Sequence, residues 1–126
     1  MITLSEVEGI FVERSRDFMQ HNREKIADNI TDITFSKDGL AEIIVNGKNI
    51  CLAKHNNQLF ACAAKCPHAG TPLAEGYIDP LGNIVCPLHH YRFALKSGRN
   101  VSGEGYFLKT RKVYQEFDGV YIEVNE

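Results

Sequence analysis

Two short motifs in the middle of the chain restrict its possible folds more than any other feature. Cys66 and His68 lie in the segment CPHAG, Cys86 and His89 lie in CPLHH, and seventeen residues separate His68 from Cys86. Each motif offers one thiolate and one imidazole, so two such loops facing one another can enclose a compact metal centre. Four ligands of these types suit either a tetrahedral zinc ion or a two-iron cluster. The ligand order favours the cluster, because a Cys-x-His and a Cys-x-x-His step each let one loop reach both irons.

The other cysteines and histidines are predicted to take no part in such a centre. Cys51 in NICLA and Cys62 in FACAA lie on apolar stretches, which predicts small buried side chains. His21 and His55 have no partner at ligand spacing and are expected to face solvent.

The composition is that of one globular domain and gives no reason to expect a nucleic-acid partner. The chain has 126 residues, 44% of them hydrophobic and 24% charged, and its formal net charge is −2. Glu6 and Glu8 stand where a secretory signal would be basic and then apolar, and no apolar stretch is long enough to cross a bilayer. We therefore expect a soluble cytoplasmic protein without a membrane partner, whose cysteines are reduced thiols or metal ligands.

Positive charge is concentrated around the two motifs. Residues 64–112 contain seven basic and three acidic residues, a local net charge of +4. Two interpretations remain open. Either this is an ordinary solvated face, or Lys65, Arg92, Lys96 and some of residues 109–112 steer the motif region onto an acidic partner.

An N-terminal helical extension, residues 1–30, is expected to precede the main domain, residues 31–126. Ser5 and Glu8 form a capping-box pattern at the start of this extension. Apolar residues at loose helical spacing then predict one or two helices between Glu6 and Ile30.

From Ile33 onward the pattern becomes that of antiparallel β-structure. Apolar runs alternate with the turn dipeptides Asn46-Gly47, Asn56-Asn57 and Asp118-Gly119, which indicates hairpins. A glycine- and proline-rich unit, about residues 64–105, carries both motifs and is inserted between the hairpins. The expected strands are residues 40–45, 49–53, 59–64, 76–78, 83–85, 112–117 and 120–124.

The motif region resembles the Rieske family of iron–sulfur proteins, whose pattern is Cys-x-His followed, after a gap of similar size, by Cys-x-x-His. The segments CPHAGTPLAEG and CPLHHYRFALKSG resemble the two cluster loops of soluble Rieske ferredoxins. The resemblance implies an all-β fold of antiparallel sheets, arranged as a partly open barrel with an inserted cluster-binding subdomain. It also implies one 2Fe-2S cluster per chain, with Cys66 and Cys86 on the inner iron and His68 and His89 on the outer, more exposed iron.

Two features of respiratory Rieske proteins are missing from this chain. Those proteins carry an extra cysteine in each loop, joined as a disulfide, where this chain has Thr71 and Leu88. They also place a serine hydroxyl near a bridging sulfide, where this chain has Tyr91. The loss of these polar contacts predicts a reduction potential toward the low end of the general range of about −150 to +300 mV for such clusters.

His90 is a third departure, because the family usually has glycine at this position. With histidine at both positions, the second loop could supply its imidazole ligand from His89, as Cys-x-x-His, or from His90, as Cys-x-x-x-His. The family spacing favours His89, and His90 is expected to point outward, near a docking surface.

The resemblance implies a one-electron carrier, a ferredoxin component that passes electrons from a reductase through His68 and His89 to a terminal oxygenase or other redox enzyme. The chain is too short to include the mononuclear-iron domain of ring-hydroxylating oxygenases, so no substrate-processing site is expected. Two redox alternatives remain open: a small Rieske subunit of a nitrite-reductase-type complex, and a redox or iron–sulfur sensor. A structural zinc site is the non-redox alternative.

Overall fold

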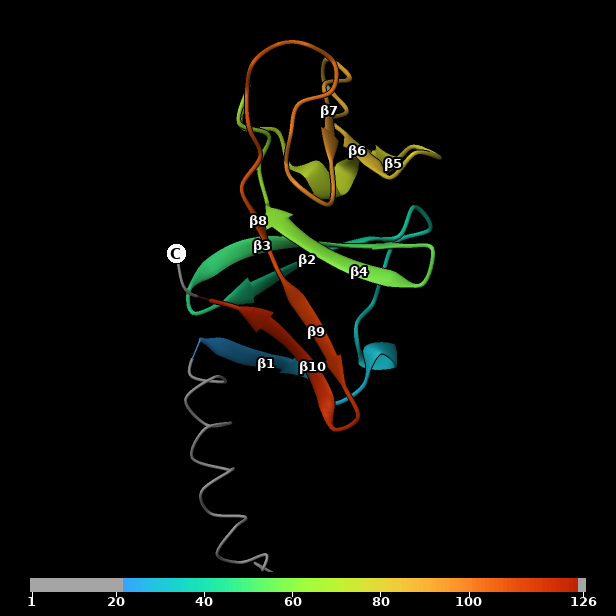
Figure 1. The fold of residues 1–126 in the computed structure, drawn as a ribbon, viewed down its shortest axis with the longest axis vertical. Coiled ribbons are helices and arrows are strands. Elements are labelled where there is room, and N and C mark those ends of the chain that lie inside the picture. The colour runs from blue at the N-terminus through green and yellow to red at the C-terminus, as the bar shows by residue number, and fades with distance from the viewer. Residues whose placement is uncertain (1–21, 125–126) are drawn as a thin grey trace, which may run out of the picture.

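A computed structural model describes residues 22–124, in which ten strands and two short 3-10 helices form an all-β domain (Figure 1). The strands pair into three antiparallel sheets, with the orders β1-β10-β9, β2-β3-β4-β8 and β5-β6-β7. The predicted all-β class is therefore confirmed. Among these residues, no helix has the length and apolar character that crossing a bilayer requires. In chain order the elements are β1 (Arg23–Ala27), η1 (Ile30–Asp32), β2 (Leu40–Val45), β3 (Lys48–His55), β4 (Gln58–Ala63), η2 (Leu73–Glu75), β5 (Tyr77–Ile78), β6 (Asn83–Val85), β7 (Arg92–Ala94), β8 (Thr110–Arg111), β9 (Val113–Glu116) and β10 (Gly119–Glu123).

The first described strand lies where the sequence predicted helix. Residues 23–27 form β1, which pairs antiparallel with β10 and places Lys25 opposite Tyr121. The helix predicted between Glu6 and Ile30 is therefore wrong at these residues, and its earlier part falls in residues 1–21, outside the described residues. Only Ile26 of β1 packs firmly against an apolar cluster of the domain. A strand with one such residue has no period-2 pattern, so its pairing with β10 determines its conformation.

The predicted hairpins are confirmed. Asn46 and Gly47 join β2 to β3 at φ angles of 51° and 79°, and Asn56 and Asn57 join β3 to β4 at 51° and 63°. Positive φ at both central residues is what a two-residue type I′ turn requires, and asparagine and glycine adopt it most readily. The hairpin of β9 and β10 and the short hairpin of β5 and β6 also form where the sequence predicted them.

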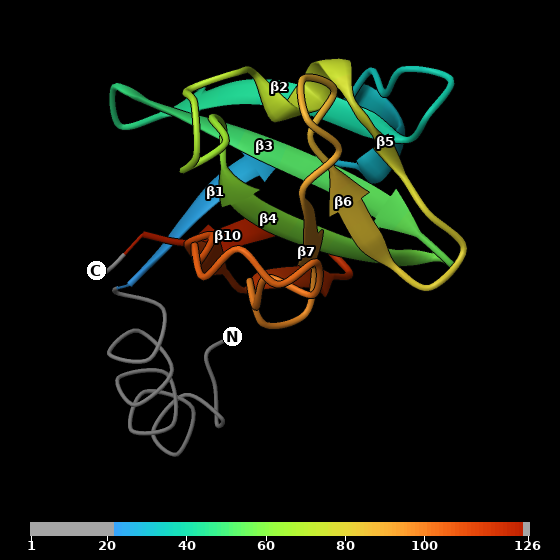
Figure 2. The same ribbon diagram turned by 90° about the horizontal axis from the view of Figure 1, so that it is seen from above.

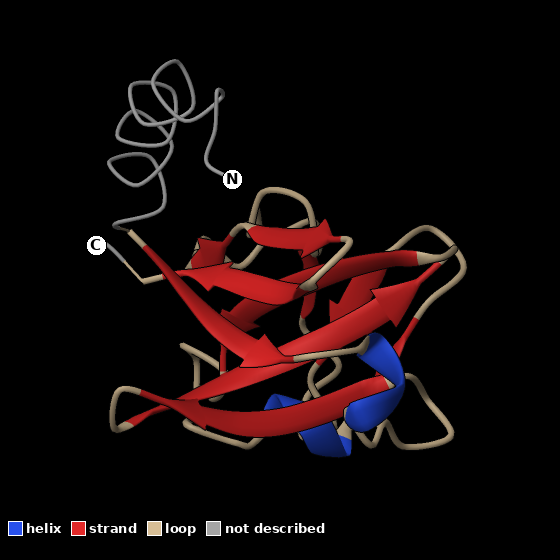
Figure 3. Ribbon diagram, turned by 90° about the horizontal axis from the view of Figure 1, so that it is seen from below, coloured by secondary structure: helices blue, strands red, loops and turns tan. Residues whose placement is uncertain are grey.

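The sheets enclose two apolar clusters. The one nearer the motif loops, called the upper cluster, includes Cys66 and Cys86 and supports these loops; the other is called the lower cluster. The lower cluster includes Leu52, Ala61 and Ile122, from the four-stranded sheet and β10. In the upper cluster Ile84 and Phe93 of the small sheet pack against β3 and β4. Figure 2 shows the small sheet lying across these strands, and Figure 3 shows the same strands from the opposite side. All four cysteines, Cys51, Cys62, Cys66 and Cys86, belong to the upper cluster.

The chain beyond β7 turns back on itself through a close backbone contact at Gly98. This residue has a φ of +79°, and a Cβ atom there would lie 1.8 Å from the carbonyl oxygen of Leu108. The Leu108 N–H donates to the Gly98 carbonyl at 2.9 Å. Only glycine fits this contact, which closes residues 99–107 into a loop, called the third loop below.

Candidate metal centre

The first motif forms a tight loop between β4 and η2. The Cys66 N–H donates to the carbonyl of Thr71 at 2.8 Å, and the Cys66 carbonyl accepts from the Gly70 N–H at 2.8 Å. An antiparallel bridge between Lys65 and Pro72 closes the base of the loop. The loop therefore carries Cys66 at its base and His68 near its turn.

The second motif repeats this hydrogen-bond pattern between β6 and β7. The Cys86 N–H donates to the Tyr91 carbonyl at 2.9 Å, and the Cys86 carbonyl accepts from the His90 N–H at 2.9 Å. His90, with a φ of 61°, occupies the position that Gly70, with a φ of 75°, has in the first loop. Its side chain is exposed, as predicted. The matched geometry explains why glycine would suit position 90.

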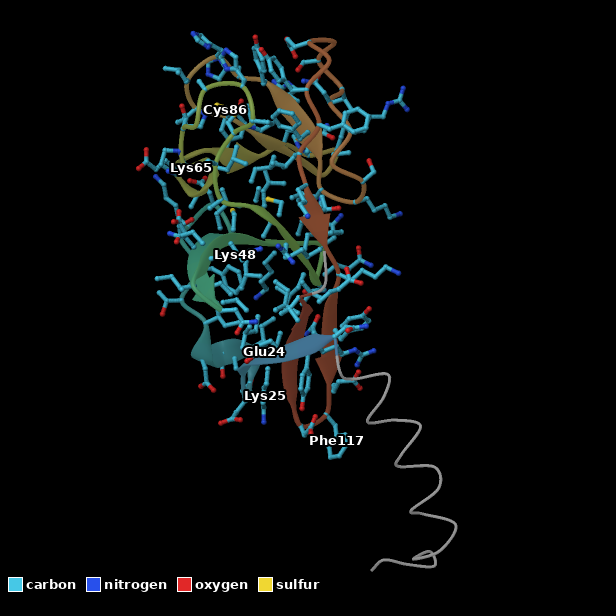
Figure 4. All side chains as sticks on the ribbon, turned by 90° about the vertical axis from the view of Figure 1, so that its left-hand side faces the viewer. Glu24, Lys25, Lys48, Lys65, Cys86 and Phe117 are labelled. Carbon is cyan, nitrogen blue, oxygen red and sulfur yellow. The ribbon has the colours of Figure 1, made fainter. Side chains whose placement is uncertain are left out.

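The thiols of Cys66 and Cys86 meet beneath the two loops. Cys66 is 2% exposed and Cys86 is fully buried, and Cys86 lies near one end of the molecule in Figure 4. Burial raises the pKa of the Cys66 thiol, the His68 backbone N–H lowers it, and a hydrogen bond with Cys86 raises it further. Binding of a metal ion by the Cys66 thiol therefore has to displace a proton that burial favours.

The imidazoles of His68 and His89 form a second pair. Their ring centroids are 4.8 Å apart and their planes meet at 62°. His89 is exposed, whereas His68 is partly buried and its Nδ1 is a buried nitrogen without a hydrogen-bond partner. Leaving such a nitrogen unpaired costs stability. A metal ligated through this atom would satisfy it.

The side chains of the four predicted ligands fall into two groups. Among residues 22–124, no three His, Cys, Asp or Glu side chains converge as ligands of one ion would. The four predicted ligands form a thiol pair and an imidazole pair instead. A two-iron cluster can take a thiol pair on one iron and an imidazole pair on the other. The arrangement fits the cluster.

Aromatic side chains surround the imidazole pair. The ring of Tyr91 lies 4.2 Å from that of His68, with an angle of 30° between their planes, and the ring of Tyr106 lies 5.7 Å from His68. Burial raises the pKa of Tyr91, and the nearby carboxylate of Glu104 raises it further. Tyr91 therefore stays a neutral phenol beside the imidazoles at neutral pH.

The buried carboxylate of Asp79 ties the turn between β5 and β6 to β7. Asp79 is 6% exposed and accepts hydrogen bonds from the backbone N–H groups of Leu81 and Asn83, each at 3.0 Å. It also accepts from the Asn83 amide at 3.0 Å and from the Arg92 guanidinium at 2.7 Å. Burial raises the pKa of Asp79, but the hydrogen bonds from Asn83 and Arg92 outweigh it and hold this pKa below its ordinary value.

Replacing Asp79 with alanine is expected to lower the free energy of unfolding by about 2 to 4 kcal/mol, because four buried or half-buried donors lose their acceptor. For a domain of this size, such a loss lowers the thermal midpoint by on the order of 10 °C. Because the pKa of Asp79 is depressed in the folded state, its stabilisation is present above the ordinary carboxyl pKa and is lost as pH falls through the folded value. Thermal unfolding of both proteins across the acidic range, with the exposed Asp38→Ala as control, checks this. A variant as stable as the wild type at neutral pH would contradict it.

The basic residues near the motifs differ in their surroundings. The Arg92 guanidinium pairs with Asp79 at 2.7 Å. Lys96, Arg111 and Lys112 line a cavity of about 370 Å³ beside β8 and β9, away from the motif loops. The ion pair gives Arg92 a structural role, whereas Lys65 is exposed at the base of the first loop.

The remaining predicted residues lie outside the pairs. Cys51 and Cys62 are fully buried opposite one another on β3 and β4, which confirms their prediction as core side chains. His55 is half-buried beside Gly82 and not freely exposed as expected; His21 lies outside the described residues. Sequence reasoning missed Asp79 and the third loop.

An antiparallel β domain with two matched loops, a buried thiol pair and an imidazole pair has the architecture of a small iron–sulfur protein. Residues 26–106 match the sequence pattern of the Rieske [2Fe-2S] domain family. The chain belongs to this family. A domain of this family implies a 2Fe-2S cluster.

Comparisons with individual proteins agree with this assignment. The chain is 30% identical over 90 residues to the 3-phenylpropionate/cinnamic acid dioxygenase ferredoxin subunit of Photorhabdus laumondii subsp. laumondii, covering 71% of this chain and 86% of that protein. A chain from the complex of reduced oxygenase and oxidized ferredoxin in carbazole 1,9a-dioxygenase superposes with a TM-score of 0.70 at 20% identity, covering 83% of this chain and 95% of that one. A protein described as a nitrite reductase NADPH small subunit superposes with a TM-score of 0.67 at 20% identity, covering 79% and 96%. At these identities the two structures bear on the fold alone.

Proposed function

We propose that this chain is a Rieske-type ferredoxin that carries one electron at a time on a single 2Fe-2S cluster. In this proposal Cys66 and Cys86 bind one iron, and His68 and His89 bind the other. The observation that carries it is the separation of these side chains into a buried thiol pair and an imidazole pair with ring centroids 4.8 Å apart. The unpartnered Nδ1 of His68 supports it, because ligation would satisfy a buried nitrogen that has no other partner.

When bound, the cluster supplies a one-electron couple that is neutral when oxidised and carries a charge of about −1 when reduced. The chain's own residues determine where electrons enter and leave. Cys66 and Cys86 face the apolar core, whereas His89 is exposed, so exchange takes place on the histidine side. Leu88 and Phe107, 52% and 73% exposed, offer apolar contact near this side and exclude water when a partner docks.

The partners of this carrier are a ferredoxin reductase as electron donor and a terminal oxygenase or other redox enzyme as acceptor. The ferredoxin subunit of a dioxygenase among its relatives supports this assignment. The likeness to a structure of oxygenase with ferredoxin is consistent with it. We place the carrier in the cytoplasm, where its four free thiols stay reduced, so that Cys66 and Cys86 are available as metal ligands.

A fixed small subunit of a nitrite-reductase-type complex is the second candidate. The fold is compatible with this role, because a protein described as such a subunit superposes with a TM-score of 0.67. A fixed subunit co-purifies with a large subunit from its own cells, whereas a diffusible ferredoxin does not. A sensor differs from both, because its affinity for a partner changes with the cluster state while electron transfer stays slow.

Anaerobically purified full-length protein is expected to contain two irons and two acid-labile sulfides per chain. After dithionite reduction it should give an electron paramagnetic resonance signal averaging near g of about 1.9, because histidine ligation distinguishes this cluster from all-cysteine ones. Metal analysis with labile-sulfide determination and low-temperature spectra measures both. Zinc without labile sulfide, after careful anaerobic reconstitution, would overturn the electron-carrier proposal.

A further inference from the structure

The third loop places one carboxylate beside the imidazole pair. Residues 99–107 leave β7 near the two motif loops, as the orange segment at the top of Figure 1. Antiparallel bridges join Phe93 to Asn100 and Arg99 to Phe107, so both ends of the loop are anchored. Glu104 lies between these anchors and is the one acidic residue of the loop.

The side chain of Asn100 fixes the conformation of this loop. Its Oδ1 accepts from the backbone N–H groups of Ser102 and Gly103, each at 2.8 Å, and from that of Glu104 at 3.4 Å. The Ser102 hydroxyl accepts from the Arg92 N–H at 3.0 Å and donates to the Glu104 carboxylate. The exposed carboxylate is thus hydrogen-bonded to its own loop.

Contacts on both sides of Glu104 bring the third loop to the surroundings of His68. Two residues after it, Tyr106 packs its ring 5.7 Å from the His68 ring. On its other side, the Ser102 hydroxyl accepts a hydrogen bond from the Arg92 N–H. The neighbouring Tyr91 places its ring 4.2 Å from the His68 ring. The hydrogen bond from Ser102 is the main reason that the pKa of Glu104 lies below its ordinary value, and His68 lowers it further. Glu104 is therefore a negative charge next to the imidazole pair at neutral pH.

We propose that Glu104 is an electrostatic positioning residue whose fixed carboxylate lowers the reduction potential on the histidine side of the centre. This inference rests on the proposed function. Reduction adds one negative charge to the centre, and a neighbouring negative charge opposes that addition by Coulomb repulsion. Glu104 binds neither metal nor partner in this role, and acts on the centre through space from beside His68.

Replacing Glu104 with glutamine tests this, because the amide keeps the shape and the acceptor for Ser102 while removing the charge. At a fixed potential we expect the ratio of reduced to oxidised protein to rise about three- to tenfold, a shift of about 28 to 59 mV for one electron. Dye-mediated anaerobic redox titration, followed by absorbance, measures it. Glu24→Gln is the matched control, since Glu24 is exposed on β1 at the end of the molecule far from Cys86 (Figure 4), and should leave the potential unchanged.

Two further measurements separate an electrostatic effect from a structural one. The difference in potential between Glu104→Gln and wild type should shrink as salt screens the carboxylate. Ser102→Ala removes the hydrogen bond that holds the Glu104 carboxylate. This variant should also raise the reduction potential, but by less than Glu104→Gln does. Equal potentials in wild type and Glu104→Gln, with the cluster present in both by metal content and resonance signal, overturn the inference and leave the electron carrier standing. Absence of a cluster from the wild type would overturn the proposed function itself.

Discussion

Replacing Cys86 with alanine is expected to abolish cluster binding, whereas replacing Cys62 with alanine should leave it intact. Both thiols are fully buried and lie in the same apolar cluster, so burial alone does not distinguish them. Cys86 meets Cys66 at the base of the two matched loops, next to the imidazole pair. Cys62 instead meets Cys51 across β3 and β4.

Iron and acid-labile sulfide per chain, measured on proteins purified side by side, are the readout. Cys86→Ala and Cys66→Ala should lose nearly all of both, because one thiolate cannot hold the inner iron and metal binding is coupled to folding of the loops. Cys62→Ala and Cys51→Ala should keep both, with a loss of about 1 kcal/mol or less in stability for one buried sulfur. Far-ultraviolet circular dichroism controls for unfolding. Retention of iron in Cys86→Ala together with its loss in Cys62→Ala would reject the assigned thiol pair.

The motif region was predictable because its chemistry is encoded locally. Each loop spans six residues and holds its cysteine and histidine within a few positions of one another, so the sequence alone indicates a group of candidate ligands. The turn dipeptides Asn46-Gly47 and Asn56-Asn57 were equally informative, since positive φ is a property of the residues at those positions.

Strand β1 was not predictable because its conformation depends on distant residues. Arg23 lies opposite Glu123 on the neighbouring strand, although the two residues are near opposite ends of the sequence. The Arg23 guanidinium also contacts Glu116 at 3.0 Å and covers the Tyr114 ring at 3.6 Å. These contacts stabilise an extended segment whose own residues favour neither helix nor strand strongly. Tertiary pairing therefore overrode the helical pattern that the sequence suggested.

The third loop was missed for a different reason. Asn100 followed by Ser102 and Gly103 is a recognisable turn signal, but nothing local indicates that the loop packs near His68, more than thirty residues earlier in the chain. That proximity comes from the Gly98 contact and the bridges at Phe93 and Arg99. The ligand spacing thus predicts the candidate centre, whereas the charges around it depend on tertiary contacts.

Replacing His89 with glycine is expected to eliminate the cluster, while the same change at the adjacent His90 should preserve it. The structure makes this pair a sharp test of ligand register, because both imidazoles are exposed. His89 pairs with His68 at 4.8 Å between ring centroids. His90 instead occupies, at a φ of 61°, the left-handed position that Gly70 fills in the first loop.

The two variants should also differ in stability. His90→Gly relieves a left-handed conformation and should raise the free energy of unfolding by up to about 1 kcal/mol, after allowance for the greater chain entropy of glycine. Its iron content and reduced resonance spectrum should match the wild type, whereas His89→Gly should lack labile sulfide. The reverse outcome would move the second imidazole ligand to position 90. Because Cys86, Tyr91 and the loop's hydrogen bonds are common to both variants, the comparison isolates the imidazole itself as the ligand.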